Sequence, residues 1–448
     1  MADGRTYYLD VTDILKYASH NSTVSGIQRV TLNVIGQLVA KHGPSRIRLV
    51  GYHPKQRKVL ELDSSWCSPD YRFDQMEFQR WFRLGGGYGS IREWSRIYKH
   101  RPLRRSLHRL RAYLSLIAGR RKFFEKRGIS VPGWMASGGD RIVGDFEPNP
   151  GDRVVILGAT WEFPEYINAL VAQKQARRFE VLAFVHDLIP VKAPAYVAEG
   201  MSDAFRNWLD SVYRMADRLV ANSGHTASDL RADMAQRGLD IPVATAPLAH
   251  EFLTDKQLST PLRVATLYAS ERPYVLFVGT IESRKNVWGL LRAWKALAED
   301  LKLDTPYLVL AGKEGWGIED FRRLYACTGA LDGLVTLVDR PTDAELAHLY
   351  GNCLFTVFPS HYEGWGLPIG ESLWFGKTCV ASNTSSMPEV GGDMCAYVDP
   401  KDLTQLFNEL KRMVTDQDYR VSFEHRIHRK RLRTWSDFAD SLYAAVDG

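Results

Sequence analysis

Two glutamates separated by seven residues lie in a loop-and-helix pattern that could bind a ligand. Glu363 stands in a glycine-containing loop after the apolar run LFTVFP, and Pro368 suits the first turn of a helix that would contain Glu371. Free N–H groups at such a helix start attract a diphosphate, and Glu371 in the first turn could accept hydrogen bonds from a ribose diol. Glu363 would then face sugar hydroxyl groups. The spacing alone would fit two surface glutamates, but the glycines and the proline around them favour a binding site.

A pair of cations follows another predicted strand. In YVLFVGTIESRKN, Gly279 ends the strand, and Arg284 and Lys285 precede an apolar helical pattern. Two fixed cations beside a diphosphate would stabilise the negative charge that develops as it departs. An exposed basic pair at a helix start is the alternative interpretation. Gly312 and Lys313 end a further predicted strand and could contact a base or a phosphate.

Polar residues also follow predicted strands in the first half of the chain. His186 and Asp187 come directly after the apolar run EVLAFV. A histidine there could stabilise a partly dissociated sugar, and Asp187 could orient it or approach an acceptor, whereas a buried histidine with structural partners is the alternative. Asn222 and Ser223 follow the run RLVA, where they could line the same crevice or cap the helix that begins near Thr226.

The loop STVSGIQRV after the first predicted strand contains three weaker candidates. Gly26 would let backbone N–H groups meet a diphosphate or an acceptor. Gln28 and Arg29 are candidates for the same task, although Arg29 fits an ordinary surface position equally well.

Strands that alternate with helices would position these residues. Apolar runs of four to six residues alternate with helical patterns in both halves of the chain, as in parallel sheets covered by helices on both faces. Doubly wound domains place their ligand crevice at the carboxyl ends of the strands, and the polar residues named above follow strand ends. We therefore expect an α/β protein of two Rossmann-like doubly wound domains that face each other across a cleft.

The 448 residues suffice for two cores of roughly 200 residues each. We expect a first domain over residues 1–252, with a basic insertion at about 85–140. A polar, strand-poor linker would follow over 253–272. The second domain would span 273–448, and its last helix is a candidate for packing back on the first domain.

The cysteines and the hydropathy of the sequence indicate the cellular compartment in which we expect the protein. Five scattered cysteines, never spaced as CxxC, argue against a disulfide framework and a structural zinc site. The sequence has no run of about 18–20 apolar residues, and its start lacks the layout of a signal peptide. We expect a cytoplasmic protein.

Residues 91–128 form a strongly basic segment. They carry thirteen Lys or Arg against two Glu, a local charge of +11, whereas the whole chain has a formal charge of +6. Aromatic and aliphatic side chains lie among the charges: Trp94, Tyr98, Tyr113, Leu114, Leu116, Ile117, Phe123 and Phe124. A solvated helix packed on its domain fits this pattern, and so does contact with an anionic membrane surface or an acidic acceptor. Nucleic acid is the least favoured partner, and we expect none.

The segment FPSHYEGWGLPIGESL resembles the Glu-x7-Glu donor-binding region of glycosyltransferase family 4, the retaining enzymes of GT-B fold. VANSGHTASDL and FVGTIESRKN resemble family segments in the same order, so the likeness covers most of residues 150–400. It implies that the second domain holds a nucleotide-diphosphate sugar, that the first binds the acceptor, and that no metal or cofactor is needed. Lys285 matches the family's phosphate-contacting lysine. Thr280 stands where many members have an arginine, which leaves the division of labour between Arg284 and Lys285 open.

The resemblance assigns Glu371 to the ribose and Glu363 to the sugar. The catalytic candidates are His186, Asp187, Glu363, Arg284 and Lys285. The donor-binding candidates are Gly26, Gly279, Thr280, Arg284, Lys285, Gly312, Lys313, Glu363, Gly364, Trp365, Gly366, Leu367 and Glu371. The acceptor-binding candidates are Gln28, Arg29, Asn222 and Ser223, and no metal ligand is expected.

Retention of configuration, which the resemblance implies, would ordinarily suggest an enzyme nucleophile, but no carboxylate in the sequence has a claim to that role. Our hypothesis is a front-side reaction in which the departing diphosphate takes the proton of the incoming hydroxyl group.

VGTIESRKN followed by EGWGLPIGESL looks most like bacterial members that build O-antigen or exopolysaccharide with mannose or a related deoxysugar. We therefore expect a hexosyltransferase with GDP-mannose as the favoured donor and a glycan or lipid-linked saccharide as acceptor, working in the cytoplasm or at the periphery of the inner membrane. UDP-linked and other GDP-linked donors fit the same motifs. A nucleotide-sugar epimerase of GT-B fold and a non-catalytic nucleotide-sugar-binding protein are the alternatives.

Overall fold

The computed structural model describes residues 4–18, 26–53, 56–71, 73–82, 95, 102–118, 120, 123–124, 141–252 and 262–448. The chain divides into two compact units, Met1–Phe184 with Asn207–Arg218, and Val185–Arg206 with Leu219–Gly448. This division gives residues 185–206 and 219–252 to the second unit. The predicted domain boundary at residue 252 stays a prediction.

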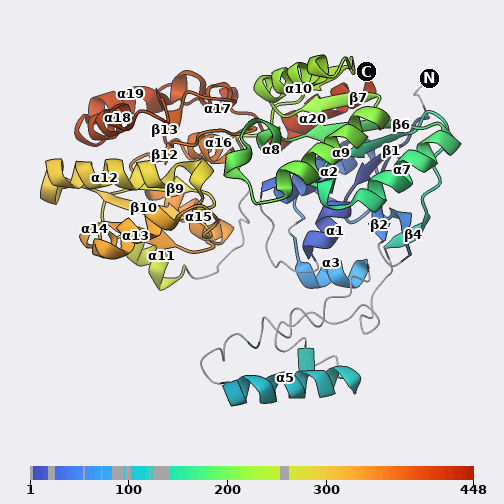
Figure 1. Cartoon of the computed structure of the whole chain (residues 1–448), viewed down its shortest axis with the longest axis horizontal. Coiled ribbons are helices and arrows are strands. Elements are labelled where there is room, and N and C mark those ends of the chain that lie inside the picture. The colour runs from blue at the N-terminus through green and yellow to red at the C-terminus, as the bar shows by residue number, and fades with distance from the viewer. Residues whose placement is uncertain are drawn as a thin grey trace. The chain divides into compact units, whose positions relative to one another are not determined.

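An eight-stranded sheet has the strand order β4-β3-β2-β1-β5-β6-β7-β8 (Figure 1). Its strands are β1 (Tyr7–Asp10), β2 (Ile47–His53), β3 (Lys58–Leu62), β4 (Ile142–Asp145), β5 (Arg153–Ile156), β6 (Glu180–Val185), β7 (Arg218–Ala221) and β8 (Val243–Thr245). β1 pairs in parallel with β2 and β5, as the sequence predicts. β3 pairs antiparallel with β2 and β4, two pairings that the sequence did not predict. The reason is the four-residue connection after β2, since a parallel crossover needs about a dozen residues or more.

α-Helices and 3₁₀ helices, the latter labelled η, follow the strands of this sheet along the chain. They are α1 (Thr12–Ala18), α2 (Gly26–His42), α3 (Gln75–Trp81), α5 (Pro102–Ile117), η3 (Thr160–Glu162), α7 (Pro164–Arg177), α8 (Ile189–Lys192), η4 (Pro194–Tyr196), α9 (Met201–Met215) and α10 (Gly224–Gln236). The sequence predicts a loop directly after β1, but Thr12 already begins α1. Asp10 explains this early start, because its Oδ1 accepts from the backbone N–H of Thr12 at 3.0 Å.

The second sheet lies within the second unit and has the order β11-β10-β9-β12-β13-β14. Its strands are β9 (Tyr274–Val278), β10 (Tyr307–Ala311), β11 (Val335–Val338), β12 (Thr356–Phe358), β13 (Cys379–Ser382) and β14 (Ala396–Val398). Every pair is parallel, which confirms the sequence prediction for this half, although β14 was not predicted. Successive strands run outward from β9 to β11 on one side and from β12 to β14 on the other. The order therefore reverses between β9 and β12, where doubly wound sheets bind their ligands.

Helices join these strands and continue to the end of the chain. They are α11 (Val264–Ala269), η5 (Ser283–Lys285), α12 (Val287–Leu301), η6 (Lys302–Asp304), α13 (Glu319–Cys327), α14 (Gly329–Asp332), α15 (Asp343–Asn352), α16 (Leu367–Trp374), α17 (Met387–Gly391), η7 (Gly392–Met394), α18 (Leu403–Thr415), α19 (Gln417–Glu424), η8 (Arg429–Arg431) and α20 (Trp435–Asp447). Part of the predicted linker is thus helical, as α11. α20 is anchored beside the end of β8, because the indole N–H of Trp435 donates to the carbonyl of Glu251 at 3.0 Å.

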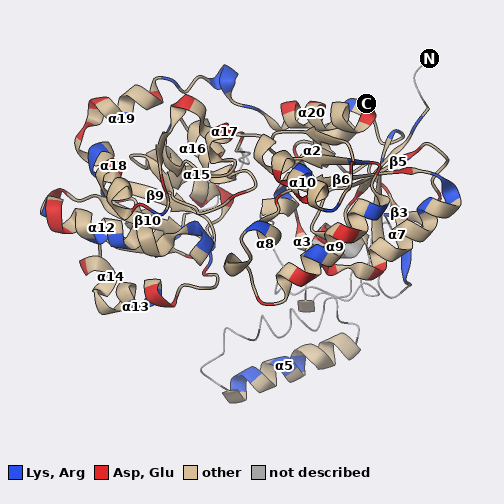
Figure 2. Ribbon diagram, turned by 45° about the horizontal axis from the view of Figure 1, so that its top comes forward, with Lys and Arg blue, Asp and Glu red and all other residues tan. Residues whose placement is uncertain are grey.

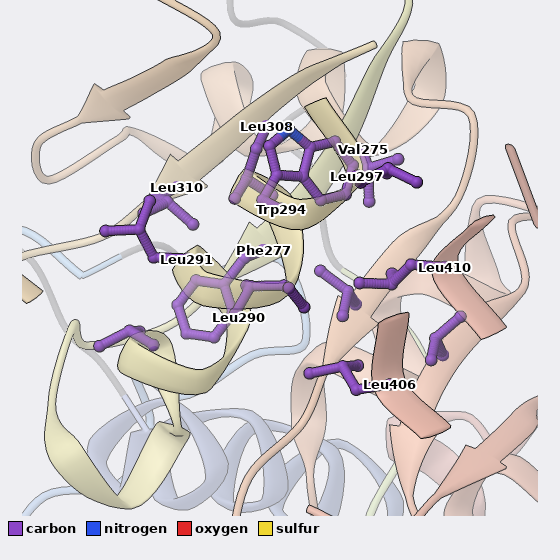
Figure 3. Close-up of a cluster of buried hydrophobic side chains, with 14 of the residues drawn as sticks. Val275, Phe277, Leu290, Leu291, Trp294, Leu297, Leu308, Leu310, Leu406 and Leu410 are labelled. Atoms are coloured by element: carbon purple, nitrogen blue, oxygen red, sulfur yellow. The ribbon is translucent and has the colours of Figure 1, made fainter. Parts of the chain in front are cut away.

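α12 lies at the centre of the hydrophobic core that covers one face of the second sheet. Asn286 caps the helix, since its side-chain oxygen accepts from the N–H of Gly289 at 3.2 Å. Leu290, Leu291 and Trp294 are fully buried on the face that meets Phe277 of β9 (Figure 3). This packing fixes the start of α12, and with it the residues Ser283–Lys285 that precede the helix.

α15 starts with a buried carboxylate that also holds α11. Glu345 accepts from Arg263 Nε at 2.6 Å, from Thr266 Oγ1 at 2.7 Å and from the backbone N–H of Thr342 at 2.8 Å. Burial alone would raise the pKa of Glu345, but these donors lower it to about 2. The ionised form is therefore favoured by folding.

Glu345→Gln is expected to lower the free energy of unfolding at pH 7 by about 1.5–3 kcal/mol, since hydrogen bonds to a charged group are lost. The depressed pKa of Glu345 stabilises the fold above the ordinary value of 4.5 and ceases to do so as the pH falls toward about 2. The difference between the wild type and the variant should therefore shrink in urea titrations from pH 7 to pH 3. Glu314→Gln, which breaks the exposed pair with Arg322, is the control and should change stability little at either pH. An unchanged difference at pH 3 would contradict the assignment.

Candidate functional site

The strand reversal between β9 and β12 brings distant loops together. β12 pairs with β9 on one side and with β13 on the other, so the residues that follow these three strands meet at one edge of the sheet. η5 lies after β9, the loop of residues 359–366 lies after β12, and residues 383–386 follow β13. The candidates Arg284, Lys285 and Glu363 come from this edge, as the sequence predicts for strand-end residues.

A buried ion cluster joins the two cations to the first glutamate. Lys285 Nζ lies 2.6 Å from Glu363 Oε1, and Arg284 Nη1 lies 2.7 Å from Glu363 Oε2. Arg284 also donates to Glu282 Oε1 and to the carbonyl oxygen of Tyr362, both at 2.7 Å. Glu363 is 7% exposed and Lys285 is 9% exposed, so the alternative of an exposed basic pair is wrong for Lys285.

Electrostatics favours the charged form of this glutamate. Burial alone would raise the pKa of Glu363, but the adjacent cations, Arg284 first, lower it to about 2. Burial lowers the pKa of Lys285, and Glu363 opposes that shift. Burial likewise acts to lower the pKa of Arg284, but Glu363 and Glu282 raise it above its usual range. The cluster thus places two cations and a carboxylate in a low-dielectric position, where each charge acts strongly on a ligand.

Hydroxyl groups from the next loop hold the Glu363 loop in place. Ser385 Oγ accepts from the backbone N–H of Glu363 at 2.9 Å. Ser386 Oγ donates to the carbonyls of Glu363 and Trp365 at 3.1 and 2.8 Å. Neither serine is among the sequence-based candidates, although both follow the apolar run TCVAS and therefore stand after a strand like the other candidates.

The second glutamate lies inside α16. Gly366, with φ +112°, is the residue before the helix, and the proline at its start is Pro368, as predicted. Glu371 is the fifth helical residue, so the expectation that it lies in the first turn is wrong: the helix begins at Leu367. Its Oε2 accepts from the hydroxyl of Tyr350 at 2.8 Å, a contact between α15 and α16 that the sequence did not indicate. Glu371 is buried and held in one orientation by this bond.

Gly279, which follows β9, and Gly312, which follows β10, are packed against each other. A Cβ on Gly312 would lie 1.9 Å from the carbonyl oxygen of Gly279, so only glycine fits after β10. Thr280 is half-buried beside this turn, and Lys313 is exposed. Their roles in donor binding stay predictions.

His186 and Asp187 directly follow β6 and lie against the Glu363 loop. A Cβ on Gly364 would lie 2.0 Å from the carbonyl oxygen of His186 and 2.8 Å from Cβ of Asp187. Burial raises the pKa of Asp187, Arg284 lowers it and Glu363 raises it, with a net upward shift. Asp187 Oδ1 accepts from the N–H of Ile189 at 2.9 Å. The structure therefore brings four of the predicted catalytic residues, Asp187, Arg284, Lys285 and Glu363, into one electrostatic group.

Gly364→Ala is expected to reduce any activity of this site by about 100-fold or more. The added methyl group meets backbone at 2.0 Å and must displace the loop that carries Glu363, and a shift of about 1 Å is enough for a loss of this size. Steady-state rates of the full chain measure the effect. Gly351→Ala in α15, where a Cβ meets nothing within 4 Å, is the matched control and should leave the rate unchanged. Full activity of Gly364→Ala would show that the loop position is irrelevant.

Asn222 and Ser223 stand after β7 and differ in role. Ser223 is the N-cap of α10, because its Oγ accepts from the N–H of Thr226 at 3.0 Å. The Oδ1 atom of Asn222 is buried without a hydrogen-bond partner among the described residues. The capping interpretation is therefore confirmed for Ser223, whereas Asn222 keeps an acceptor atom available. Their assignment to acceptor binding stays a prediction.

A polar cluster that the sequence did not indicate surrounds the start of α10. Glu389 accepts from the N–H groups of Gly224 and His225, both at 2.7 Å. The Tyr362 hydroxyl lies 3.0 Å from His225 Nε2 and donates to Asp229. Tyr362 directly precedes Glu363, so this cluster adds a further support to the loop.

The described part of the chain contains no group of three or more His, Cys, Asp or Glu that could hold a metal ion. The expectation that no cofactor is needed stays a prediction. Within the same residues, no helix is long and apolar enough to cross a membrane.

Part of the second half of the chain matches a known protein family. Residues 260–430 match the model of the family described as glycosyl transferases group 1. These residues form a group 1 glycosyl transferase domain. The domain contains η5, the Glu363 loop and α16, and therefore the ion cluster described above.

Known relatives match parts of the chain. The O-antigen chain mannosyltransferase B of Escherichia coli is 35% identical over 147 residues, which are 33% of this chain and 38% of that protein. The serotype-specific mannosyltransferase WbdA of Escherichia coli is 27% identical over 277 residues, which are 60% of this chain and 33% of that protein. The chain thus spans little more than a third of the length of these curated relatives.

Solved structures show the fold. The sucrose-phosphate synthase of Thermosynechococcus elongatus has a TM-score of 0.56 at 17% identity, and the match covers 99% of this chain and 98% of that one. Anabaena HepE in complex with UDP has a TM-score of 0.57 at 12% identity, with 99% of each chain covered. The fold is GT-B, which confirms the predicted class of two Rossmann-like domains.

Three candidates lie outside the group 1 domain, in the first compact unit. Gly26, with φ +48°, is the first residue of α2, so the part of the predicted loop STVSGIQRV from Gly26 onward is helical. Gln28 Nε2 donates to Asp13 Oδ2 at 2.9 Å, and the N–H of Ala159 reaches the same oxygen at 3.1 Å. Arg29 is half-buried. The sequence analysis missed Asp13, which lies between the ends of β1 and β5, where the order of the eight-stranded sheet reverses.

Trp365 lines a cavity of about 300 Å³. The other lining residues are Pro247, His250, Glu389, Val390, Gly392, Met394, Arg431 and Arg433. The indole N–H of Trp365 is buried without a partner among the described residues. Its assignment to donor binding stays a prediction, as do those of Gly366 and the half-buried Leu367.

Proposed function

We propose that the chain is a retaining, metal-independent glycosyltransferase of family 4 that transfers a hexose from a nucleotide-diphosphate sugar to a glycan or lipid-linked saccharide. The observation that carries the proposal is the buried cluster of Arg284, Lys285 and Glu363 beside α16, at the strand reversal of the group 1 domain. This arrangement offers two cations to a diphosphate and a carboxylate to sugar hydroxyl groups.

The proposed reaction exchanges one bond at the anomeric carbon for another. The bond between that carbon and the diphosphate oxygen breaks, and its electron pair leaves with the diphosphate. The acceptor oxygen bonds to the same carbon from the same face, and its proton passes to the departing diphosphate oxygen. Arg284 and Lys285 stabilise the negative charge of the leaving group, and the pre-paired Glu363 keeps both cations in position.

Glu371, in α16, binds the nucleotide part of the same donor. Its Oε2 is fixed by Tyr350, which leaves the carboxylate oriented to accept hydrogen bonds from a ribose diol. His186 and Asp187 lie against the Glu363 loop and are the residues that we assign to the sugar side of the reaction.

Mannose is the favoured sugar, with GDP-mannose as its donor. The support is the similarity to two partial relatives that are named as mannosyltransferases, one of the O-antigen chain and one serotype-specific. By the same likeness we propose a role in bacterial surface polysaccharide synthesis, at the cytoplasmic side of the inner membrane.

A transfer assay tests this function. The full chain is incubated with GDP-mannose and a synthetic mannose-terminated oligosaccharide, without added metal, and the product is analysed by mass spectrometry and by NMR of the anomeric proton. An α-linked mannosyl product supports a retaining transfer, because the anomeric configuration of GDP-mannose is α. A β-linked product would overturn retention. Binding of nucleotide sugars with no product from any acceptor would favour the non-catalytic alternative, and a changed free nucleotide sugar would favour the epimerase.

A further inference from the structure

The helix α5 carries two apolar faces, and only one of them is buried. Ala112 and Leu116 pack with Phe124 in a small cluster that Tyr113 and Phe123 border. This cluster uses many of the apolar residues that made the basic segment look like a packed insertion. The buried side of α5 thus packs within the basic segment itself, and packing of the segment on its domain stays a prediction.

The opposite face of α5 is an exposed row of aliphatic residues. Leu103, Leu107, Leu110, Leu114 and Ile117 are 87%, 65%, 56%, 57% and 81% exposed. Their spacings of four, three, four and three residues place them on one stripe of a helix that turns about 100° per residue. At the same pitch Ala112 lies about 180° from Leu103, so the exposed stripe and the buried face are back to back. Five of the eleven exposed large hydrophobic residues in the described part of the chain lie on this one helix.

Positive charge flanks the exposed stripe. Arg104 and Arg111 are exposed and lie about 80–100° from Leu103 on one side of the helix. The helix has no acidic residue, and the blue parts of its ribbon in Figure 2 mark its arginines. Arg109 lies toward the other side, where its Nε donates to Ser95 Oγ at 2.8 Å. An aliphatic stripe with basic flanks matches the chemistry of a bilayer surface, where acyl chains meet anionic head groups.

We propose that α5 docks the protein onto an anionic lipid bilayer, with Leu103, Leu107, Leu110, Leu114 and Ile117 inserted at the level of the head groups and Arg104 and Arg111 over lipid phosphates. A second copy of the chain would need a matching apolar surface, and the basic flanks of two α5 helices repel each other. Nucleic acid would use the arginines but not the leucines. The observed combination is therefore best matched by anionic lipid. This inference goes beyond the proposed function and is tested without measuring transfer, so either can fail alone.

The test is flotation of the full chain with vesicles of phosphatidylcholine, with and without about 30% phosphatidylglycerol. We expect the wild type to float with the anionic vesicles at about 50 mM salt and to be released at about 500 mM, where charges are screened. Leu107→Gln with Leu114→Gln keeps charge and helix propensity and should reduce the bound fraction on the order of tenfold. Arg104→Gln with Arg111→Gln should have a similar effect. Leu303→Gln, at an exposed leucine of η6, is the matched control and should bind like the wild type.

Four results would overturn the proposal. The wild type could fail to float with anionic vesicles at low salt, or it could float equally well with neutral ones. The leucine pair could bind like the wild type. Light scattering could show a dimer that the leucine pair dissociates, which would assign the stripe to a second copy. Since the replaced leucines are exposed, an unchanged melting temperature is expected and verifies that each variant is folded.

Discussion

Glu363→Gln is expected to lower the rate of sugar transfer by about 10²–10³-fold, the range found when a preorganised electrostatic group is removed from an active site. The neutral amide has almost the same shape, so the loss comes from charge. Glu363 bonds Lys285 at 2.6 Å and Arg284 at 2.7 Å. Without its charge Lys285 loses this carboxylate partner, whereas Arg284 keeps Glu282 and the Tyr362 carbonyl. Transfer from GDP-mannose to a mannose-terminated acceptor measures the change.

Stability should fall in the same variant. Breaking a buried ion pair by neutralising one partner costs about 3–5 kcal/mol, because the remaining charge is buried without compensation. Urea titration at pH 7 measures this cost. Glu314→Gln is the matched control, since Glu314 pairs with Arg322 in the same unit but at an exposed position, and both its activity and its stability should stay close to wild type. Wild-type transfer by Glu363→Gln would contradict the proposed site.

Lys285→Met is expected to reduce transfer by a similar factor of about 10²–10³ while changing stability much less than Glu363→Gln does. The methionine fills the space beside the Phe358 ring, over which Lys285 Nζ lies at 4.5 Å, and Glu363 keeps its pair with Arg284. The lost rate reflects the missing cation at the diphosphate. Rates with saturating donor separate this loss from weaker donor binding.

The double variant Glu363→Gln with Lys285→Met tests whether the two side chains are coupled. For a buried ion pair the free energy of unfolding should partly recover in the double variant, which an exposed pair would not show. Removing Lys285 also removes the buried cation that Glu363→Gln leaves unpaired, so the double variant should be more stable than Glu363→Gln alone. The same cycle on Glu314 and Arg322 should give a coupling within about 0.5 kcal/mol. Additive losses in the buried cycle would show that the two side chains act independently.

The sequence predicts those site residues that directly follow a strand. β9, β10, β12 and β13 each appear as apolar runs, and parallel strands must deliver their following loops to one edge. Arg284, Lys285 and Glu363 could therefore be placed together before any coordinates. Their pairing could not, because Lys285 and Glu363 are 78 positions apart and the order of strands in the sheet decides which loops touch.

Contacts between helices and between loops lie beyond such patterns. Tyr350 of α15 reaches Glu371 of α16, and helix periodicity marks Tyr350 only as a core residue. Ser385 and Ser386 hold the Glu363 loop through single hydroxyl groups, which leave no periodic signal. The antiparallel edge formed by β3 and β4 was missed for a different reason: residues 63–141 separate the two strands, so no local turn marks their pairing.

The start of α16 shows how a boundary error shifts a mechanistic detail. Pro368 indicates a helix start, and a helix that began at Pro368 would place Glu371 fourth, at the end of its first turn. The helix begins at Leu367, so Glu371 is its fifth residue, just beyond the first turn, and is oriented by Tyr350. Its proposed bond to the ribose therefore depends on the carboxylate and not on the free N–H groups of the helix.

Binding of nucleotide sugars to the group 1 domain is the most direct test of the proposed site. The measurement is a thermal-shift panel of GDP-, UDP-, dTDP- and CMP-sugars, without metal, on the wild type and on Glu371→Ala. A ligand that binds only the folded chain raises its melting temperature by mass action. We expect GDP-mannose to raise the melting temperature of the wild type and to leave that of Glu371→Ala unchanged. No shift with any nucleotide sugar, or an equal shift in the variant, would contradict the site.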